Sequence, residues 1–260
     1  MKNTGTAIWA EYIKIRKSKI LAITIIIFII IPLMMGLMIF VTKNPEIASK
    51  LGMIGTKANM FGQNEWSGYF GMISQALSSV GLIGFGFVTS YVFGREHIDR
   101  ALKDILSLPV KRSSIVLAKF IIIAIWCTIL AIVLYIIAII MGKIMNLEGW
   151  STGLFWEFTL KYAIASLLTL LLSPFVAAIT GYSRGIIAPL GFIIFTMILA
   201  QFVGLIGLGP YFPWAIPGLF SVGNDSQGLQ IQISSYIILA FTFVIGYWAT
   251  VYWWKSADHH

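Results

Sequence analysis

Six long apolar runs, free of Asp, Glu, Lys and Arg, divide the chain. A helix needs about 20 mainly apolar residues to cross the hydrocarbon core of a bilayer, and every run reaches that length. None alternates with the period of two that a membrane-spanning strand requires. The pattern therefore predicts an all-α, polytopic membrane protein with six transmembrane helices. The expected spans are Ile20–Val41, Tyr69–Phe93, Phe120–Met141, Tyr162–Tyr182, Ile186–Leu208 and Ile233–Trp254.

Composition leads to the same class. The 260 residues are 58% hydrophobic and 11% charged, whereas soluble domains carry about 25% charged residues. Even a soluble domain of roughly 300 residues buries only about 75% of its unfolded surface, so lipid must cover the remaining apolar area. One membrane domain over residues 1–260 is expected. The net charge of +8 comes from basic residues at the ends of the spans, a placement that favours anionic lipid rather than nucleic acid.

The basic residues also predict the orientation. Thirteen of the eighteen Lys and Arg residues fall in the N-terminal segment, the second and fourth loops and the C-terminal tail. Positive loops stay in the cytosol, so both termini are expected there. The first run is longer than the apolar core of a signal peptide and is read as a retained span. His259 and His260 read as the remnant of an affinity tag and are left out of any metal site.

Residues 4–19 form a basic amphipathic pattern before the first span. Ile8, Tyr12 and Ile15 fall at helical spacing, with Trp9 and Ile13 beside them, and Glu11, Lys14 and Lys17 occupy another side. This pattern predicts a helix lying in the cytosolic membrane interface. The alternative is a charged flank that only sets the topology.

Two further features concern the outer half and the packing of the spans. Residues 209–232 are rich in proline and glycine yet also apolar, which predicts short broken helices that re-enter the outer leaflet and cap or gate an exit. A partly ordered interfacial loop is the alternative.

Glycines near the middle of the second span allow close helix approach, either to a second permease or within the chain. The candidate interface or gate residues are Gly81, Gly84, Gly86, Pro210, Pro213, Trp214 and Pro217.

The segment between the second and third spans contains an amphipathic, salt-bridged pattern. Over residues 95–106 the apolar side chains Ile98, Leu102 and Ile105 recur at i, i+4 and i+7. Acid-before-base pairs at i, i+4 support an exposed helix, and Pro109 ends it. The apolar stripe needs a partner, either a lipid surface or a groove in another protein.

This segment resembles the corresponding loop of the type-2 permeases of ATP-binding cassette transporters, the ABC-2 family. The family pattern places a Glu near the end of the second span and a Leu-Pro-x-x-Arg stretch before the third, although Arg100-Ala101 replaces the usual Gly-Thr. The opening Trp9-Ala10-Glu11-Tyr12 is also similar, particularly to permeases linked to bacitracin and lantibiotic resistance or immunity. The matching loop residues are Glu96, Leu102, Lys103, Ile105, Leu106, Leu108, Pro109, Val110, Arg112 and Lys119.

The resemblance implies a mechanism. Residues 95–106 would be a coupling helix docked in a cleft of a cytosolic ATPase, the turn 181–185 a second contact, and Glu96 a link to the span end or to the ATPase. The complex would hold two ATPases, which carry the ATP and Mg, and a second permease, identical or related. The expected activity is export of a hydrophobic or amphipathic compound from a bacterial cell. The expected coupling residues are Glu96, Ile98, Arg100, Leu102, Lys103, Ile105, Leu106, Pro109, Arg112 and Arg184.

Absent motifs narrow the function further. The sequence contains no GxxxxGK[ST] phosphate loop and no HExxH zinc motif, so ATP hydrolysis is expected on a separate subunit, and no catalytic, cofactor or metal site is expected here. Ion-coupled carriers usually hold ionisable groups inside their spans, and the six runs have none. The alternatives are a non-ATP secondary carrier or a scaffold whose loop helix binds a regulator. Glu96 and its neighbours would then form only solvated surface pairs.

Overall fold

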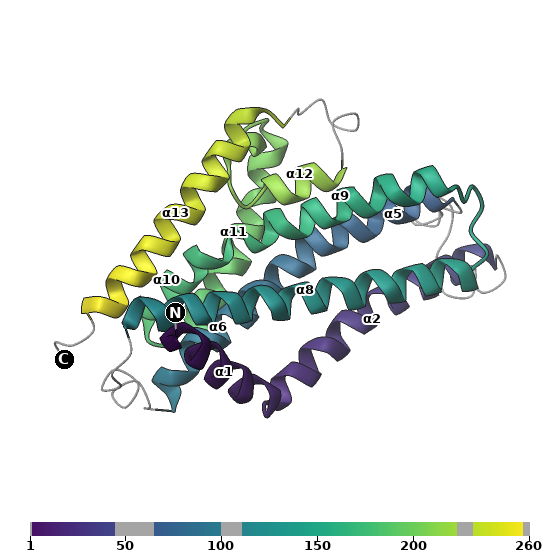
Figure 1. The fold of residues 1–260 in the computed structure, drawn as a ribbon. Coiled ribbons are helices and arrows are strands. Elements are labelled where there is room, and N and C mark those ends of the chain that lie inside the picture. Colours follow the sequence, from purple (N-terminus) through teal and green to yellow (C-terminus); the bar gives the residue numbers. More distant parts are fainter. Residues whose placement is uncertain (1, 45–64, 100–110, 223–230, 257–260) are drawn as a thin grey trace.

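A computed structural model describes residues 2–44, 65–99, 111–222 and 231–256 of the chain. The described residues form helices joined by short turns (Figure 1). In chain order the helices are α1 (Lys2–Arg16), α2 (Lys19–Lys43), α5 (Trp66–Ala76), η1 (Leu77–Gly81), α6 (Leu82–Ile98), α8 (Arg112–Ile144), α9 (Thr152–Leu170), α10 (Ser173–Ser183), α11 (Ile187–Leu205), η2 (Gly209–Tyr211), α12 (Ile216–Val222) and α13 (Ile233–Ser256).

Six helical spans in the described part of the chain are long and apolar enough to cross a membrane, which confirms the predicted all-α polytopic class. Two of them are composite: α5, η1 and α6 form one, and α9 and α10 form another. The second and third spans extend beyond their predicted ends, to Ile98 and back to Arg112. The predicted runs exclude ionisable residues, whereas the helices continue through Glu96 and Lys119, whose side chains pair with each other.

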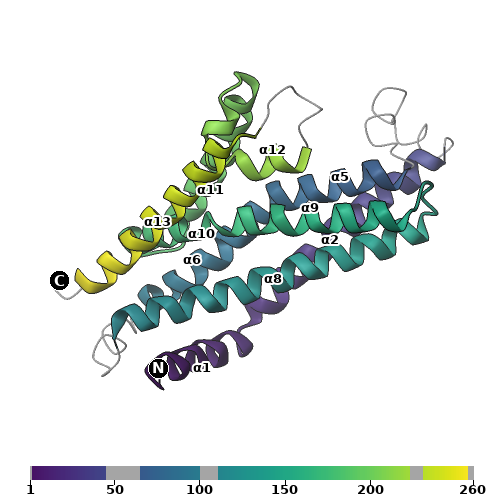
Figure 2. The same cartoon turned by 45° about the horizontal axis from the view of Figure 1, so that its top comes forward.

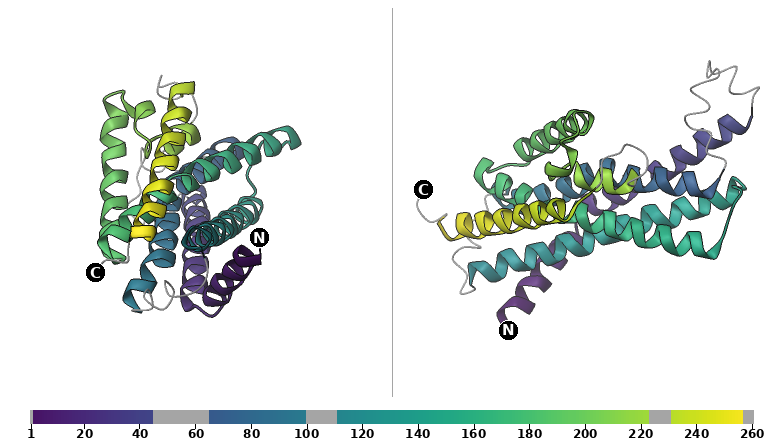
Figure 3. Two further views of the ribbon diagram at one scale, coloured as in Figure 1. Left: turned by 60° about the vertical axis from the view of Figure 1, so that its left-hand side comes forward. Right: turned by 90° about the horizontal axis from the view of Figure 1, so that it is seen from above.

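Both termini lie at the same end of the bundle, which we call the terminal end (Figures 1 and 2). At this end α6, α8, α10 and α13 are gathered together. Towards the opposite end the helices separate into two groups, one with α2, α5, α8 and α9 and the other with α11 and α13. The short helix α12 lies between the two groups (Figure 3).

The interior contains two clusters of buried apolar side chains. The larger one is rich in aromatic residues, and within it the indole Nε1 of Trp126 donates to Thr24 Oγ1 at 3.1 Å. The smaller cluster joins α10, α11, α12 and α13 around Leu172, Ile216 and Leu239. Buried polar groups need such partners in an apolar interior.

Two local irregularities interrupt the spans. Residues Leu77–Gly81 form a π-helical turn in the second span. The fourth span breaks at Leu171 and Leu172, and Pro174 then lies in the first turn of α10, where its missing N–H costs no hydrogen bond.

The N-terminal helix α1 turns part of its predicted apolar face inward and leaves the rest exposed. Ile15 is buried and Ile8 packs on the core, as an apolar face should, but Trp9 remains 62% exposed and Tyr12 44% exposed. Glu11, predicted on the polar side, is buried. The physical reason is an ion pair with Lys119, which the sequence pattern of one helix does not contain.

The segment after the fifth span forms two short helices, η2 and α12, at its described positions. Gly209, Pro210, Ile216 and Pro217 are buried, and α12 packs against α5, η1 and α9. The segment therefore enters the bundle between the two helix groups rather than lying beside it.

Candidate functional site

Lys119, near the start of α8, has no exposed surface. Its Nζ donates to Glu96 Oε1 at 2.7 Å, to the carbonyl of Val92 at 3.0 Å and to Glu11 Oε2 at 3.3 Å. An ammonium group has three N–H donors, so all three are used. The rings of Phe93 and Trp254 lie 5.6 and 5.7 Å from the same nitrogen. The site thus holds a fully desolvated cation between two carboxylates and two aromatic faces.

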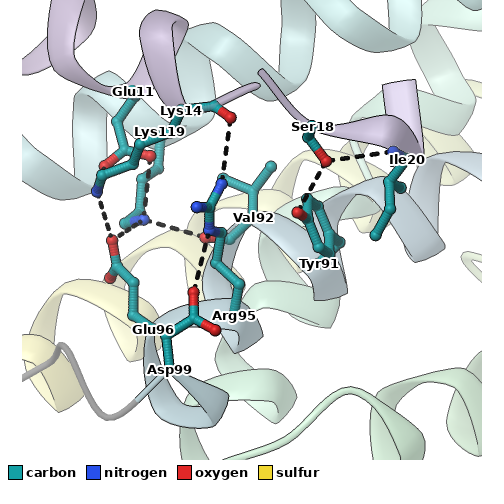
Figure 4. Close-up of polar contacts among 10 residues, drawn as sticks. All are labelled: Glu11, Lys14, Ser18, Ile20, Tyr91, Val92, Arg95, Glu96, Asp99 and Lys119. Carbon is teal, nitrogen blue, oxygen red and sulfur yellow. Dashed lines mark hydrogen bonds and ion pairs between the residues drawn. The ribbon is translucent and has the colours of Figure 1, made fainter. Parts of the chain in front are cut away.

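A second lysine completes a four-residue ion network, which we call the tetrad: Glu11, Lys14, Glu96 and Lys119 (Figure 4). Lys14 Nζ lies 2.6 Å from Glu11 Oε1 and 3.1 Å from Glu96 Oε1. Two carboxylates and two ammonium groups leave no formal net charge. The tetrad joins α1, α6 and α8, and the ion pairs span up to 108 residues of sequence.

Electrostatics keep the N-terminal members of the tetrad charged. Burial raises the pKa of Glu11, but the positive charges of Lys119 and Lys14 outweigh it and the net pKa lies below its ordinary value. Burial lowers the pKa of Lys14, while Glu96 and Glu11 raise it to a net value above the ordinary one. Each group therefore stabilises the charged form of the other.

Further polar contacts surround the tetrad. Arg95 donates through NH1 to the carbonyl of Lys14 at 3.4 Å and pairs with Asp99 at 3.7 Å. The hydroxyl of Ser18, which caps α2, bonds that of Tyr91 at 2.9 Å (Figure 4). The turn between α1 and α2 is thus fastened to α6 as well.

The tetrad occupies both ends of the predicted coupling segment. Residues 95–98 are helical, as predicted, and continue α6, whereas residues 100–106 of the predicted coupling helix lie outside the described residues. Glu96 is 2% exposed, and its pairs link it to the third span and to α1. The surface-pair alternative is therefore wrong for Glu96 but describes Arg95 and Asp99, which are partly exposed.

The other predicted coupling residues are placed as follows. Ile98 is 60% exposed at the end of α6. Arg112 begins α8, and its guanidinium donates to the carbonyl of Lys255 at 3.0 Å. Arg184 is exposed and ends α10 in the left-handed conformation, with φ 52°. Outside the described residues lie Arg100, Leu102, Lys103, Ile105, Leu106 and Pro109.

Of the predicted interface glycines, two pack within the chain. A Cβ on Gly84 would lie 2.5 Å from the ring of Phe28 on α2, and one on Gly86 would meet Ile193 on α11. Both therefore follow the internal-packing alternative. Gly81 ends the π-helical turn and is buried. Pro210 and Pro217 are buried in the segment after α11, and Pro213 and Trp214 are half-buried beside them.

The turn Gly181-Tyr182-Ser183-Arg184-Gly185 also matches the G-x-S-x-G spacing of hydrolase nucleophile elbows. Such an elbow joins a strand to a helix and pairs its serine with a histidine. Here Ser183 ends a helix, is exposed, and its hydroxyl donates to the carbonyls of Thr180 and Gly185, both at 3.4 Å. The turn has the geometry of a helix C-terminus and not that of a nucleophile elbow.

Glu11, Lys14 and Lys119 were not predicted as site residues. The sequence did contain one signal. Glu96 follows the second apolar run and Lys119 precedes the third, so the two residues flank the same loop and can meet across it. The partnership with Glu11 has no local signal.

Comparisons with known proteins agree with this architecture. The family described as ABC-2 family transporter protein matches residues 7–201. The Bacitracin transport permease protein BCRB of Bacillus licheniformis is 28% identical over 185 residues, which cover 70% of this chain and 86% of that protein. No solved structure matches the chain. A match over residues 7–201 includes the whole tetrad, the first four spans and most of the fifth, and the chain therefore belongs to the ABC-2 family of transporter permeases.

Proposed function

We propose that this chain is the membrane-spanning subunit of an ATP-driven exporter in a bacterial plasma membrane. Both termini and the segment 100–110 would face the cytosol. The basic residues support this orientation, because thirteen of eighteen lie in segments assigned to that side. The two described termini lie at one end of the bundle, as an even number of spans requires (Figure 1).

The observation that carries the coupling proposal is the direct bond between Glu96 and Lys119 at 2.7 Å. Glu96 precedes the segment 100–110 and Lys119 follows it, so the bond closes the base of that segment. Glu11 adds α1 to the same junction. A load applied to the segment by a bound ATPase would reach α1, α6 and α8 together, because buried ion pairs resist separation.

The energy source would be on other subunits. The chain has no phosphate loop, and two cytosolic ATPases would bind and hydrolyse ATP with Mg. ABC-2 permeases generally work with ATPase subunits and as pairs, which supports a second permease, either a copy of this chain or a related one. The basic flanks and the exposed aromatic residues of α1 would contact membrane lipid.

The proposed cargo is a hydrophobic or amphipathic compound such as a peptide antibiotic, and the biological role would be resistance or self-immunity. The support is the similarity to a protein named for bacitracin transport and the absence of ionisable residues from the predicted apolar runs. A compound of this kind can enter the pathway from lipid without a charged binding site.

The test is to weaken the apolar stripe of the coupling segment. Leu102→Asp combined with Ile105→Asp places two charges on the face that would enter the ATPase cleft. We expect the amount of ATPase that co-purifies with the tagged permease to fall at least tenfold, measured by quantitative mass spectrometry.

A matched control carries the same substitutions on the opposite side of the membrane. Leu51→Asp combined with Ile54→Asp changes the predicted outer loop and should leave ATPase recovery unchanged. Equal recovery for both double variants, with both inserted in the membrane, would contradict the coupling assignment and favour a secondary carrier or a scaffold.

A further inference from the structure

A cavity of about 300 Å³ lies between the π-helical turn of the second span, α11 and α12. Three of its lining residues belong to α12, the short helix between the diverging helix groups (Figures 1 and 2). The described residues that line it are Gln75, Ser78, Ser79, Leu82, Met197, Ala200, Gln201, Gly204, Leu205, Trp214, Ala215, Gly218, Leu219 and Val222.

Two glutamines from different spans converge on this cavity. Gln75 lies on α5 and Gln201 on α11, and both side chains are exposed. Neither amide hydrogen-bonds another group among the described residues. With a rise of 1.5 Å per residue, Gln75 lies about 13 Å along the span from Trp66, which places it within the membrane-spanning length. An unsatisfied amide is costly in hydrocarbon, so polar groups at this depth face water or a ligand.

The wall that carries Gln75 is fixed in place by hydrogen bonds. Ser78 in the π-helical turn bonds the hydroxyl of Ser221 on α12, and both hydroxyls lie 2.9 Å from the carbonyl of Pro217. Ser78 also donates to the carbonyl of Ser74 at 3.0 Å. These bonds hold α12 against the second span. Hydrogen-bonded groups thus hold part of the cavity wall, and π-helical turns of this kind are frequent at functional sites.

The chemistry of the lining indicates the ligand. The described lining residues include no Asp, Glu, Lys, Arg or His, so they offer nothing to neutralise a charged group. The two amides offer both donors and acceptors, whereas the hydroxyls of Ser78 and Ser79 already donate to groups of the protein. Leu82, Met197 and Leu205 supply an apolar wall beside them. This combination suits an uncharged hydrogen-bonding group attached to an apolar body.

We propose that this cavity binds the neutral, hydrogen-bonding end of an amphipathic molecule, and that Gln75 and Gln201 recognise its amide or hydroxyl groups. The inference deepens the proposed export function, on which its physiological meaning rests. A volume of about 300 Å³ is at the lower limit of small-molecule sites. It accommodates a single sugar ring or a short amide segment and not a whole peptide antibiotic.

The experiment uses the full chain in phosphatidylcholine nanodiscs without an ATPase. Three photoreactive probes share one decyl chain and differ in the head group: a glucoside, a glycinamide and a phosphate. We expect the two neutral probes to label residues 197–222 at least fivefold more than the phosphate probe, at equal concentration. The neutral probe that labels these residues more strongly shows whether the cavity prefers a sugar or an amide head group.

Variants identify the residues responsible. Gln75→Leu combined with Gln201→Leu should reduce neutral-probe labelling at least fivefold, whereas Gln232→Leu, an exposed glutamine outside the cavity, should not. Gly218→Leu adds a bulky side chain to the cavity lining and keeps both glutamines. A Cβ there meets no atom within 4 Å, and the variant should abolish labelling even if the double variant misfolds. Equal or stronger labelling by the phosphate probe, or unchanged labelling in Gly218→Leu, would overturn the assignment. ATPase capture is measured separately, so failure here leaves the coupling proposal intact.

Discussion

Lys119 determines the chemistry of the terminal end at the scale of single residues. Its ammonium group is completely desolvated, and three acceptors and two aromatic rings replace its water. Taking charges out of water costs several kcal/mol per ion, and the attraction between the partners recovers that cost only while all of them are present. The tetrad is therefore an all-or-none unit, and removing one member should be much more damaging than its individual bonds suggest.

Replacing Lys119 tests this cooperativity. Lys119→Met keeps the length and apolar stem of the side chain but leaves the two buried carboxylates with Lys14 alone. We expect a loss of about 3–5 kcal/mol in the free energy of unfolding, as for other broken buried pairs, measured by denaturant unfolding in detergent. Lys143→Met, at an exposed lysine on the same helix, should change it by less than about 0.5 kcal/mol. Adding Glu96→Gln to Lys119→Met should restore part of the loss, and strict additivity of the two changes would contradict a coupled network.

The tetrad also predicts how stability depends on pH. The pKa of Glu11 is lowered from 4.5, so its contribution is present above pH 4.5 and is lost as the pH falls through the lower folded value. The pKa of Lys14 is raised from 10.5, so its contribution is present below pH 10.5 and is lost as the pH rises through the higher folded value. We expect Glu11 and Lys14 to keep their contribution from about pH 5 to pH 10 and to lose it outside this window.

Thermal unfolding of the wild type and of Glu11→Gln across this range measures the effect. The difference between the two proteins should be constant from about pH 6 to pH 9 and should shrink below pH 4.5, where Glu11 of the wild type becomes protonated. A difference that changes between pH 6 and pH 8 would show that Glu11 titrates there and would contradict the pairing.

At the scale of helices, the close approach of α10 and α13 holds the last span to the bundle. Gly246 makes this contact possible, because a Cβ there would collide with the backbone of Phe175. Thr250, one turn further on, donates to the carbonyl of Pro174 at 3.2 Å, which satisfies a group near the helix break. A backbone atom cannot move aside as a side chain can, so the packing tolerates no larger residue at this position.

Gly246→Ala should therefore destabilise the protein by about 1–3 kcal/mol through overpacking. Gly191→Ala is the matched control, since Gly191 is also helical but a Cβ there meets no atom within 4 Å. This control should be neutral or stabilising by up to about 1 kcal/mol, the gain in helix propensity. Denaturant unfolding of both variants in the same detergent makes the comparison, and equal effects would contradict the role of close approach.

The structure also shows which elements the sequence was able to predict. The six spans follow from their long apolar runs, a signal that each helix carries by itself. The burial of Glu11 could not be predicted in this way, because its partner is a lysine 108 residues away. The pairing of Glu96 with Lys119, through which the helices of the second and third spans continue, likewise forms only on folding. Long-range ion pairs are thus beyond what the pattern of one segment predicts.

On the scale of the whole molecule, the two ends of the bundle have different properties. At the terminal end, the tetrad and the bond from Arg112 to Lys255 tie α1, α6, α8 and α13 together around the base of the segment 100–110. Towards the other end, the helix groups diverge around α12 (Figure 2), which lines a cavity without charged residues in its described lining. A base that receives force and a separate site that binds cargo are what the proposed exporter requires.

The most direct test of this account is co-purification of the chain from its native membrane in a mild detergent, with mass spectrometry of the proteins recovered in near-equal amounts. The account predicts a soluble protein with a phosphate-loop motif, together with a second permease if the pair is not made of identical chains. Recovery of this chain without an ATPase, under conditions that keep other membrane complexes intact, would contradict ATP-driven export and favour a secondary carrier or a scaffold.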